Sequence, residues 1–466
     1  MRSTADDLLE GTVTGSTSTS PTTSTTTTPG TTPGTSPAAE APPPFRRLAV
    51  ACGIGTSLEY FDFFVYGTAA SLVFNRIFFS ADDPWFGTFY ALATFAVGFL
   101  ARPVGAILFG HVGDRIGRRS ALMVSFGAMG VATLLIGLLP GYHAIGVAAP
   151  VLLVLLRVVH GLSVGGEAGG AALLAVEHAP ADRRGRYGSL VALGSPVGAF
   201  LANGSFALLV LLPEDALLSW GWRVPFIAGV LVALVGLFVR SRLHETPEFQ
   251  RLLAERRTER LPLAVVLRRH RRLVLLTAGT NLGFSAFVFV QFNFLLSYGP
   301  LHLGLPRSTL LNATVLGTVA HAVGLVVFSR LSDRVGRRPV MLGGAVTCGL
   351  FAFPLFWLVD TGAQGPILLA MVVGAVGSSA LFGPMLTYFV ELFGPAVRYT
   401  GVSIGYQLGA VLGGGLSPVI ANRLVAATGG STSVSVYLVV AMLVTVACLV
   451  ALPETMRRSE SAAAAR

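Results

Sequence analysis

The stretch GTSLEYFDFFVYG at 55–67 is apolar enough to enter a membrane, yet it contains Glu59 and Asp62. Residues three or four apart on a helix share a face, so the two acids point to the same side as Tyr66. A charge at the bilayer centre costs about 2.5–3.5 kcal/mol on insertion scales, so such groups usually face a cavity and serve a function. Burial and mutual repulsion let one acid take and release a proton near neutral pH. We predict a proton carrier, with Asp62 favoured slightly over Glu59; the alternative is an ion pair with a buried arginine.

A later apolar stretch contains Arg157, His160 and Glu167. At about 100° per residue, His160 and Glu167 lie roughly 60–80° from Arg157, on one side of a helix. A guanidinium in a dry cavity can hold a carboxylate through two parallel hydrogen bonds, so Arg157 is a candidate substrate ligand. The alternative is that Arg157 permanently neutralises one of the two acids. His160 is expected to form neutral hydrogen bonds or to relay a proton, and Glu167 to pair locally.

Other polar side chains on expected spans widen the candidate site. Tyr66 lies on the face of the two acids and is assigned to substrate binding. Arg102, beside Pro103, either extends to the lipid headgroups or acts in a gate. Five uncharged side chains of the second half would bind substrate from the opposite wall or join helices. They are Asn281, Gln291, Asn293, His321 and Gln407.

Membrane-spanning helices must position these side chains. The 466-residue chain is 53% hydrophobic and only 12% charged, with a mean hydropathy of +0.70, unlike a soluble domain. We predict an all-α membrane protein with twelve transmembrane helices in two pseudo-symmetric six-helix bundles. The expected spans are 48–73, 85–109, 121–139, 146–177, 187–212, 220–240, 273–297, 309–329, 340–359, 366–390, 400–425 and 434–452.

The arginines predict the orientation. The net charge of +10 comes from arginine alone, in short runs between apolar segments, which argues against nucleic-acid binding. With the N-terminus in the cytoplasm, the loops expected to be cytoplasmic hold nearly all of these runs, so both termini are predicted to be cytoplasmic. The predicted segments are a disordered Thr/Ser/Pro-rich tail (1–44), an N-terminal bundle (45–240), a basic cytoplasmic linker with a surface helix (241–272), a C-terminal bundle (273–453) and a second tail (454–466).

The two halves repeat one another. GHVGDRIGRRS (110–120) aligns with SRLSDRVGRRP (329–339), and VEHAPADRRGRYGS (176–189) aligns with VELFGPAVRYTGVS (390–403). GTSLEYFDFFVY (55–66) aligns with GTNLGFSAFVFV (279–290), where Gly and Ala replace the two acids. Duplicated halves are typical of an alternating-access transporter, whose site lies near the midplane where the halves meet.

The repeated loops predict a cytoplasmic gate. Asp114 would accept hydrogen bonds from a neighbouring arginine and lie at the N-terminal end of another helix, where the helix dipole favours an anion. Glu177 would pair with Arg184, and Asp333, Glu391 and Arg398 would repeat the arrangement; the alternative is orientation charge alone. The residues assigned to the gate are Gly110, Asp114, Arg115, Gly117, Arg118, Arg119, Glu177, Arg184, Asp333, Arg334, Gly336, Arg337, Glu391 and Arg398.

GHVGDRIGRR and its weaker echo SDRVGRR resemble the loop signature of the major facilitator superfamily. LEYFDFFVYGTAASLVF, RVVHGLSVGGEAGGAALLAVEHAPADRRGRYGS, WGWRVPFIAGV and RLHETPEF narrow the resemblance to the metabolite:proton symporters, which carry small carboxylates and zwitterions such as shikimate, 2-oxoglutarate, citrate, proline and betaine. The resemblance covers 46–455 and implies proton-driven uptake through the bacterial cytoplasmic membrane. His160, Ala168 and GSLVA (188–192) depart from the usual residues, so substrate identity does not transfer.

We therefore expect a monomeric proton symporter that imports a small organic acid or zwitterion across the lipid bilayer. The chain has no phosphate-binding loop, and its histidines lack metal-ligand spacing, so we expect no enzyme, cofactor, metal or nucleic-acid partner. Two alternatives stay open: a proton-coupled exporter, and a transport-inactive sensor that signals through the tail or the linker. The residues do not decide the metabolite, the proton stoichiometry or the role of the tail.

Overall fold

The computed structural model describes residues 45–79, 84–165, 167–177, 179–241 and 262–456, and every regular element among them is a helix. The predicted tail 1–44, most of the linker and the end of the second tail lie outside the described residues. The side chains of Asp114, Arg118 and Glu167 also lie outside the description. Residues 43–466 form one compact unit.

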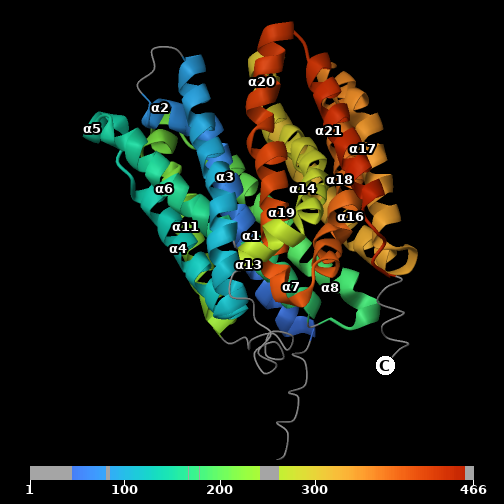
Figure 1. The fold of residues 1–466 in the computed structure, drawn as a ribbon. Coiled ribbons are helices and arrows are strands. Elements are labelled where there is room, and N and C mark those ends of the chain that lie inside the picture. Colours follow the sequence, from blue (N-terminus) through green and yellow to red (C-terminus); the bar gives the residue numbers. More distant parts are fainter. Residues whose placement is uncertain (1–44, 80–83, 166, 178, 242–261, 457–466) are drawn as a thin grey trace, which may run out of the picture. The chain divides into compact units, whose positions relative to one another are not determined.

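The first half consists of long helices joined by short turns (Figure 1). Its elements are α1 (Phe45–Ala69), η1 (Ala70–Phe74), α2 (Asn75–Ile77), α3 (Pro84–Arg115), α4 (Arg118–Leu138), α5 (Tyr142–Ile145), α6 (Ala148–Gly165), α7 (Glu167–Glu177), η2 (Ala181–Arg183), α8 (Arg184–Ala192), α9 (Gly194–Leu209), α10 (Glu214–Ala216), η3 (Leu217–Gly221) and α11 (Arg223–Ser241).

The second half follows the same plan, with π-helical turns inside two of its long helical runs. Its elements are α13 (Pro262–Arg269), α14 (Arg271–Phe289), η4 (Val290–Phe294), α15 (Leu295–His302), α16 (Arg307–Val335), α17 (Arg337–Asp360), α18 (Gln364–Leu392), η5 (Pro395–Val397), α19 (Arg398–Gly409), η6 (Ala410–Gly415), α20 (Ser417–Thr428) and α21 (Thr432–Ala451). Helix α13 lies inside the predicted linker, where a surface helix was expected.

Eleven helical runs among the described residues are long and apolar enough to cross a membrane, and they correspond in order to the second to twelfth predicted spans. The first predicted span is α1 with η1, which contains the two acids and packs against α9 and α11. Large apolar side chains such as Leu350 and Trp357 are exposed on the outer faces of the helices, where lipid can cover them. The predicted all-α membrane architecture is confirmed.

Contacts within each half and contacts between the halves use different helices. Within the halves, α1 packs on α9, α3 on α6, α16 on α18 and α17 on α18. Between them, α3 and α7 contact α19, while α8 contacts α16 and α18. The helices that carry the gate motifs therefore lie along the contact between the halves.

Glycines determine how closely α3 and α6 cross. A Cβ at Gly105 would overlap the backbone of Leu162, and a Cβ at Gly161 would overlap the carbonyl of Gly98. Two other glycines shape the repeated loops: Gly117 and Gly336 have φ angles of 137° and 112°, which L side chains rarely adopt. Each stands immediately before the helix that continues its half, α4 or α17.

The close crossing of α3 and α6 can be tested by adding one methyl group. We expect Gly105→Ala to destabilise the purified protein by about 1–3 kcal/mol, because the Cβ would meet rigid backbone rather than a movable side chain. Gly127→Ala on α4 is the matched control, since nothing lies within 4 Å of the added atom. Thermal unfolding in detergent measures both. Equal melting temperatures for the two variants would contradict the crossing.

Candidate functional site

Helices α1, α4 and α6 bring Asp62, Arg157 and His160 into one buried cluster. His160 Nε2 lies 3.8 Å from Asp62 Oδ2, and Arg157 Nη1 lies 3.4 Å from His160 Nδ1. Thr133 of α4 donates a hydrogen bond of 2.8 Å to Asp62 Oδ2. This geometry fits the alternative in which Arg157 compensates an acid of α1, with the imidazole of His160 lying between the carboxylate and the guanidinium.

Tyr66 completes this cluster from one helical turn beyond Asp62. The guanidinium carbon of Arg157 lies 3.7 Å from the centre of the Tyr66 ring, a cation–π arrangement. The Tyr66 hydroxyl forms a 2.6 Å hydrogen bond with Thr94 of α3. A Cβ at Gly98 would lie 2.9 Å from Nη2 of Arg157, so the glycine leaves room for the guanidinium. Four side chains singled out from the sequence therefore form one group inside the first half.

Glu59 lies on the wall of a separate cavity between the halves. The cavity is small, with a volume of about 30 Å³. The first half contributes Glu59, Tyr60, Phe63, Phe64, Phe99, Arg102 and Ser195. The second half contributes Phe284, Ser285, Val288, Phe289, Tyr406 and Ala410. This position between the bundles fits the site expected for a duplicated transporter.

Arg102 is a principal charged group of this cavity. Only 7% of the residue is exposed, and its guanidinium carbon lies 4.1 Å from the centre of the Phe99 ring and 5.0 Å from that of Phe63. The interpretation in which Arg102 extends to the headgroups is therefore wrong. The Tyr60 hydroxyl, from the same helix as Glu59, bonds the Tyr406 hydroxyl of the other half at 2.9 Å.

Four of the five polar candidates of the second half form hydrogen bonds with other parts of the protein. Asn281 donates to the Tyr406 carbonyl at 2.7 Å, and Gln291 donates to the Met371 carbonyl at 2.7 Å. His321 Nδ1 lies 3.0 Å from the Ala375 carbonyl. Gln407 donates to carbonyls of the first half at 3.4 Å, and Asn293 is half-buried. None of the five is among the described residues that line the cavity, and their role in substrate binding stays a prediction.

Sequence reasoning missed several lining residues. Tyr60, Ser195, Ser285 and Tyr406 were not singled out, although each lines the cavity and carries a hydroxyl group. The helical periodicity of the sequence could have indicated two of these four residues. Tyr60 neighbours Glu59, and Ser285 lies one turn beyond Asn281, to whose amide oxygen its hydroxyl donates at 3.3 Å.

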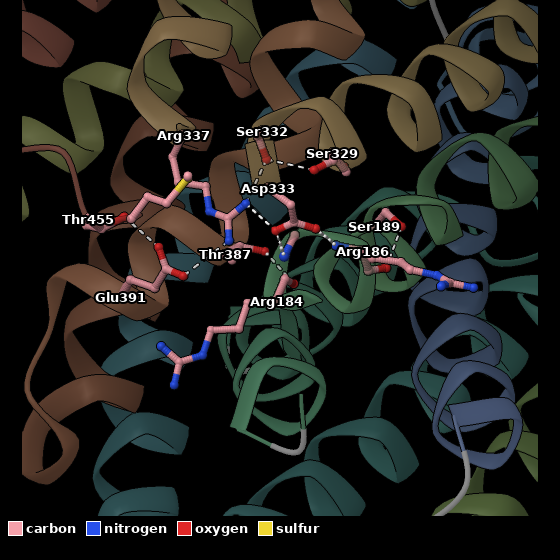
Figure 2. Close-up of polar contacts among 12 residues, drawn as sticks. Arg184, Arg186, Ser189, Ser329, Ser332, Asp333, Arg337, Thr387, Glu391 and Thr455 are labelled. Carbon is pink, nitrogen blue, oxygen red and sulfur yellow. Dashed lines mark hydrogen bonds and ion pairs between the residues drawn. The ribbon is translucent and has the colours of Figure 1, made fainter. Parts of the chain in front are cut away.

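The repeated loops meet in a network at one end of the two halves (Figure 2). Asp333 accepts backbone N–H bonds from Gly185 at 2.8 Å and from Arg186 at 2.9 Å, at the start of α8. The expected placement of an acid at a helix N-terminus thus holds for Asp333. The buried Arg337 lies between two acids, 2.5 Å from Asp333 and 3.4 Å from Glu391.

One pairing differs from the expected one. Arg398 of α19 pairs with Glu177 of α7 at 3.0 Å, an ion pair between the halves. The sequence repeat suggested pairing within each half, of Arg398 with Glu391 and of Arg184 with Glu177. In the described residues Glu391 instead contacts Arg337 and Thr455, and Figure 2 shows the Arg184 side chain apart from this network. Repetition in the sequence identifies equivalent residues, but it does not reveal contacts between the two copies.

The remaining gate candidates are exposed or make other contacts. Arg115 and Arg334 are exposed, and Arg119 donates to the Ser241 carbonyl. A Cβ at Gly110 would lie 3.1 Å from Thr400, so α3 and α19 pack closely there. The segment that follows α21 adds to the network, because Glu454 accepts N–H bonds from Arg337 at 3.1 Å and Arg338 at 2.9 Å.

Comparison with known proteins identifies the family. Residues 48–264 match the family described as Sugar (and other) transporter, and residues 292–466 match the Major Facilitator Superfamily. The inner membrane metabolite transport protein YhjE of Escherichia coli is 40% identical over 421 residues, which cover 89% of this chain and 95% of that protein. The chain belongs to the major facilitator superfamily, and it is a multi-pass membrane transporter rather than an enzyme.

Further relatives are named for their substrates. The shikimate transporter of Escherichia coli is 38% identical, with 86% of this chain and 92% of that protein covered. The proline/betaine transporter of Salmonella typhimurium is 32% identical, with 89% and 84% covered. The solved proton:xylose symporter XylE bound to 6-bromo-6-deoxy-D-glucose superposes with a TM-score of 0.72 at 19% identity, covering 90% of this chain and 98% of that one. These matches confirm the predicted relationship and the two-bundle fold.

A disulfide can test the contact between the halves. A Cβ at Gly188 of α8 would lie 3.3 Å from the Cβ of Thr387 of α18, close to the separation in natural disulfides. We expect Gly188→Cys with Thr387→Cys to cross-link on mild oxidation, in a chain whose three native cysteines are alanine. A protease site inserted within 242–261 allows the chain to be cut between the halves. A non-reducing gel then shows whether the disulfide still joins the two fragments. Gly188→Cys with Thr361→Cys is the control, and equal cross-linking of both pairs would contradict the contact.

Proposed function

We propose that the protein is a proton-coupled symporter that imports a small organic acid or zwitterion through the bacterial cytoplasmic membrane by alternating access. The observation that carries the proposal is a buried set of exchangeable charges beside a cavity between two duplicated bundles. Asp62 lies with His160 and Arg157 inside the first half, and Glu59 lies with Arg102 on the cavity wall. A carboxyl group that must exchange its proton away from bulk water is suited to couple that proton to a solute.

The relatives support the cargo class. Proteins named as shikimate and proline/betaine transporters match this chain over most of its length. Their named substrates are small molecules with a carboxylate, and the cavity offers a guanidinium together with hydroxyl groups and aromatic rings. Import is favoured over export because the family resemblance is to uptake systems. The acids would serve either direction.

The gate network supports alternating access. Contacts between the halves, Glu177 with Arg398 and Asp333 with the start of α8, lie at the end where the arginine-rich loops gather. By the positive-inside rule this end is cytoplasmic, as are both termini. In this conformation the ion pairs hold that end closed. They must break, and their charges become hydrated, when the substrate is released inward.

Transport and its coupling can be measured in liposomes with a pH-sensitive dye inside. We expect external addition of one compound class, among monocarboxylates, dicarboxylates and betaines, to acidify the lumen. The signal should fall at least about tenfold in Asp62→Asn or in Glu59→Gln, because a coupling proton needs an acid that can exchange it.

The matched control is Glu214→Gln, which removes an exposed acid that pairs with Arg76 on the surface. It should acidify the lumen like the wild type. Solute entry without acidification, together with unchanged behaviour of both buried-acid variants, would contradict proton symport.

The disulfide between residues 188 and 387 should also arrest transport until a reductant is added.

A further inference from the structure

We propose that Arg102 and Glu59 form a site at which a substrate carboxylate exchanges with a proton. In this site the guanidinium of Arg102 binds the carboxylate of a small monocarboxylate anion, and Glu59, displaced from the guanidinium, takes up one proton. The inference rests on the proposed function and deepens it, because it names the substrate class, the anchoring residue and the proton carrier.

The geometry places both groups on the same cavity. Glu59 of α1 and Arg102 of α3 line it from adjacent helices and lie within electrostatic range of each other. Both are buried, with 3% and 7% of the residue exposed. A guanidinium removed from water needs an anion beside it, and removing that anion without a replacement is costly. A substrate carboxylate that enters this cavity supplies such a replacement.

Proton coupling arises because the carboxylate of Glu59 and the carboxylate of the substrate compete for the guanidinium of Arg102. If the substrate binds Arg102 while Glu59 stays ionised, two negative charges face one positive charge in a poorly hydrated space. Protonation of Glu59 removes the excess charge and gives a neutral carboxyl group that can donate a hydrogen bond. On release of the substrate at the other side, Arg102 again attracts Glu59, and the proton leaves. One proton therefore moves with each carboxylate, and the bound complex carries no extra charge.

The groups that face Glu59 leave Arg102 as its charged partner. The described titratable side chains in electrostatic contact with Glu59 include Arg102 of α3, Tyr60 of α1 and Tyr406 of α19, while Arg157 and His160 of α6 are in electrostatic contact with Arg102. Both tyrosines are neutral at physiological pH. Asp62 bonds Thr133 and lies near His160, and it is not among the described lining residues. We therefore place the exchanged proton on Glu59 and give Asp62 the role of compensating Arg157.

The other residues that line the cavity limit which chemical groups the substrate can carry besides its carboxylate. Phe63 and Phe99 already stack on the Arg102 guanidinium, so these rings are poor partners for a quaternary ammonium group. Among the described lining residues Arg102 is the only cation, which leaves a second carboxylate of a dicarboxylate without a partner. Phe284 and Phe289 offer apolar surface, and hydroxyls such as that of Ser285 offer hydrogen bonds. This combination fits a compact, ring-bearing or hydroxylated monocarboxylate.

The direct test measures proton uptake during binding to the full-length protein in detergent. The probes are shikimate, benzoate and lactate as monocarboxylates, proline and glycine betaine as zwitterions, and 2-oxoglutarate as a dicarboxylate. In weakly buffered solution with an indicator dye, we expect the tightest binder to be a monocarboxylate that takes up one proton per molecule. Its Kd should rise about tenfold per pH unit wherever Glu59 is ionised in the free protein.

Variants separate the two residues. Glu59→Gln should bind the same monocarboxylate without proton uptake and with a Kd independent of pH. Arg102→Gln should weaken binding at least about 30-fold, because the carboxylate loses its only cation. Glu214→Gln should match the wild type. Size-exclusion chromatography and melting temperature report whether each variant folds. If Glu59→Gln does not fold, the wild type in liposomes decides, since monocarboxylate uptake with one proton must be insensitive to a membrane potential set with potassium and valinomycin.

Three results would overturn the inference: no monocarboxylate binds, a zwitterion or dicarboxylate binds best, or Glu59→Gln still takes up the proton. Failure of this inference and failure of the proposed function are distinguishable. Solute-driven acidification that depends on Asp62 but not on Glu59 leaves proton symport standing and refutes the exchange at Arg102. Solute entry without any acidification refutes symport itself.

Discussion

An ionised side chain between helices in a bilayer must find its compensating charge within the protein, because no bulk water solvates it there. Arg157 meets this requirement through His160 and Asp62, and it also stacks on a tyrosine ring. At the gate, Arg337 meets this requirement by lying between two acids. In the cavity, a solute carboxylate can replace Glu59 as the partner of Arg102. Proton coupling depends on that replacement.

The two kinds of contact in the fold suit the two tasks of a transporter. Inside the first half, glycines let the backbones of α3 and α6 touch, and such packing resists relative movement. Between the halves, the gate uses ion pairs and hydrogen bonds at helix ends. Ion pairs that become exposed on opening recover hydration, so breaking them costs much less than separating a packed core. Movement between rigid halves follows from this difference.

The sequence predicted features that follow from local spacing, whereas features that depend on helix rotation or on contacts between the halves were missed. The loop motif predicted an acid at the N-terminus of a neighbouring helix, and Asp333 holds that place, although the sequence did not indicate that the helix, α8, belongs to the other half. Arg102 was misjudged because its position along the span did not reveal which face it occupies. The pairing of Glu177 with Arg398 was missed because residues more than two hundred positions apart share no local pattern.

The most direct test of the central claim is infrared difference spectroscopy of the purified protein, recorded with and without its monocarboxylate ligand. Ligand binding should produce a new band in the protonated-carboxyl stretching region. This band should shift in heavy water and disappear in Glu59→Gln, while Asp62→Asn retains it. No new band in the wild type, or a band that persists in Glu59→Gln, would contradict the claim that a solute carboxylate and a proton exchange places at one buried guanidinium.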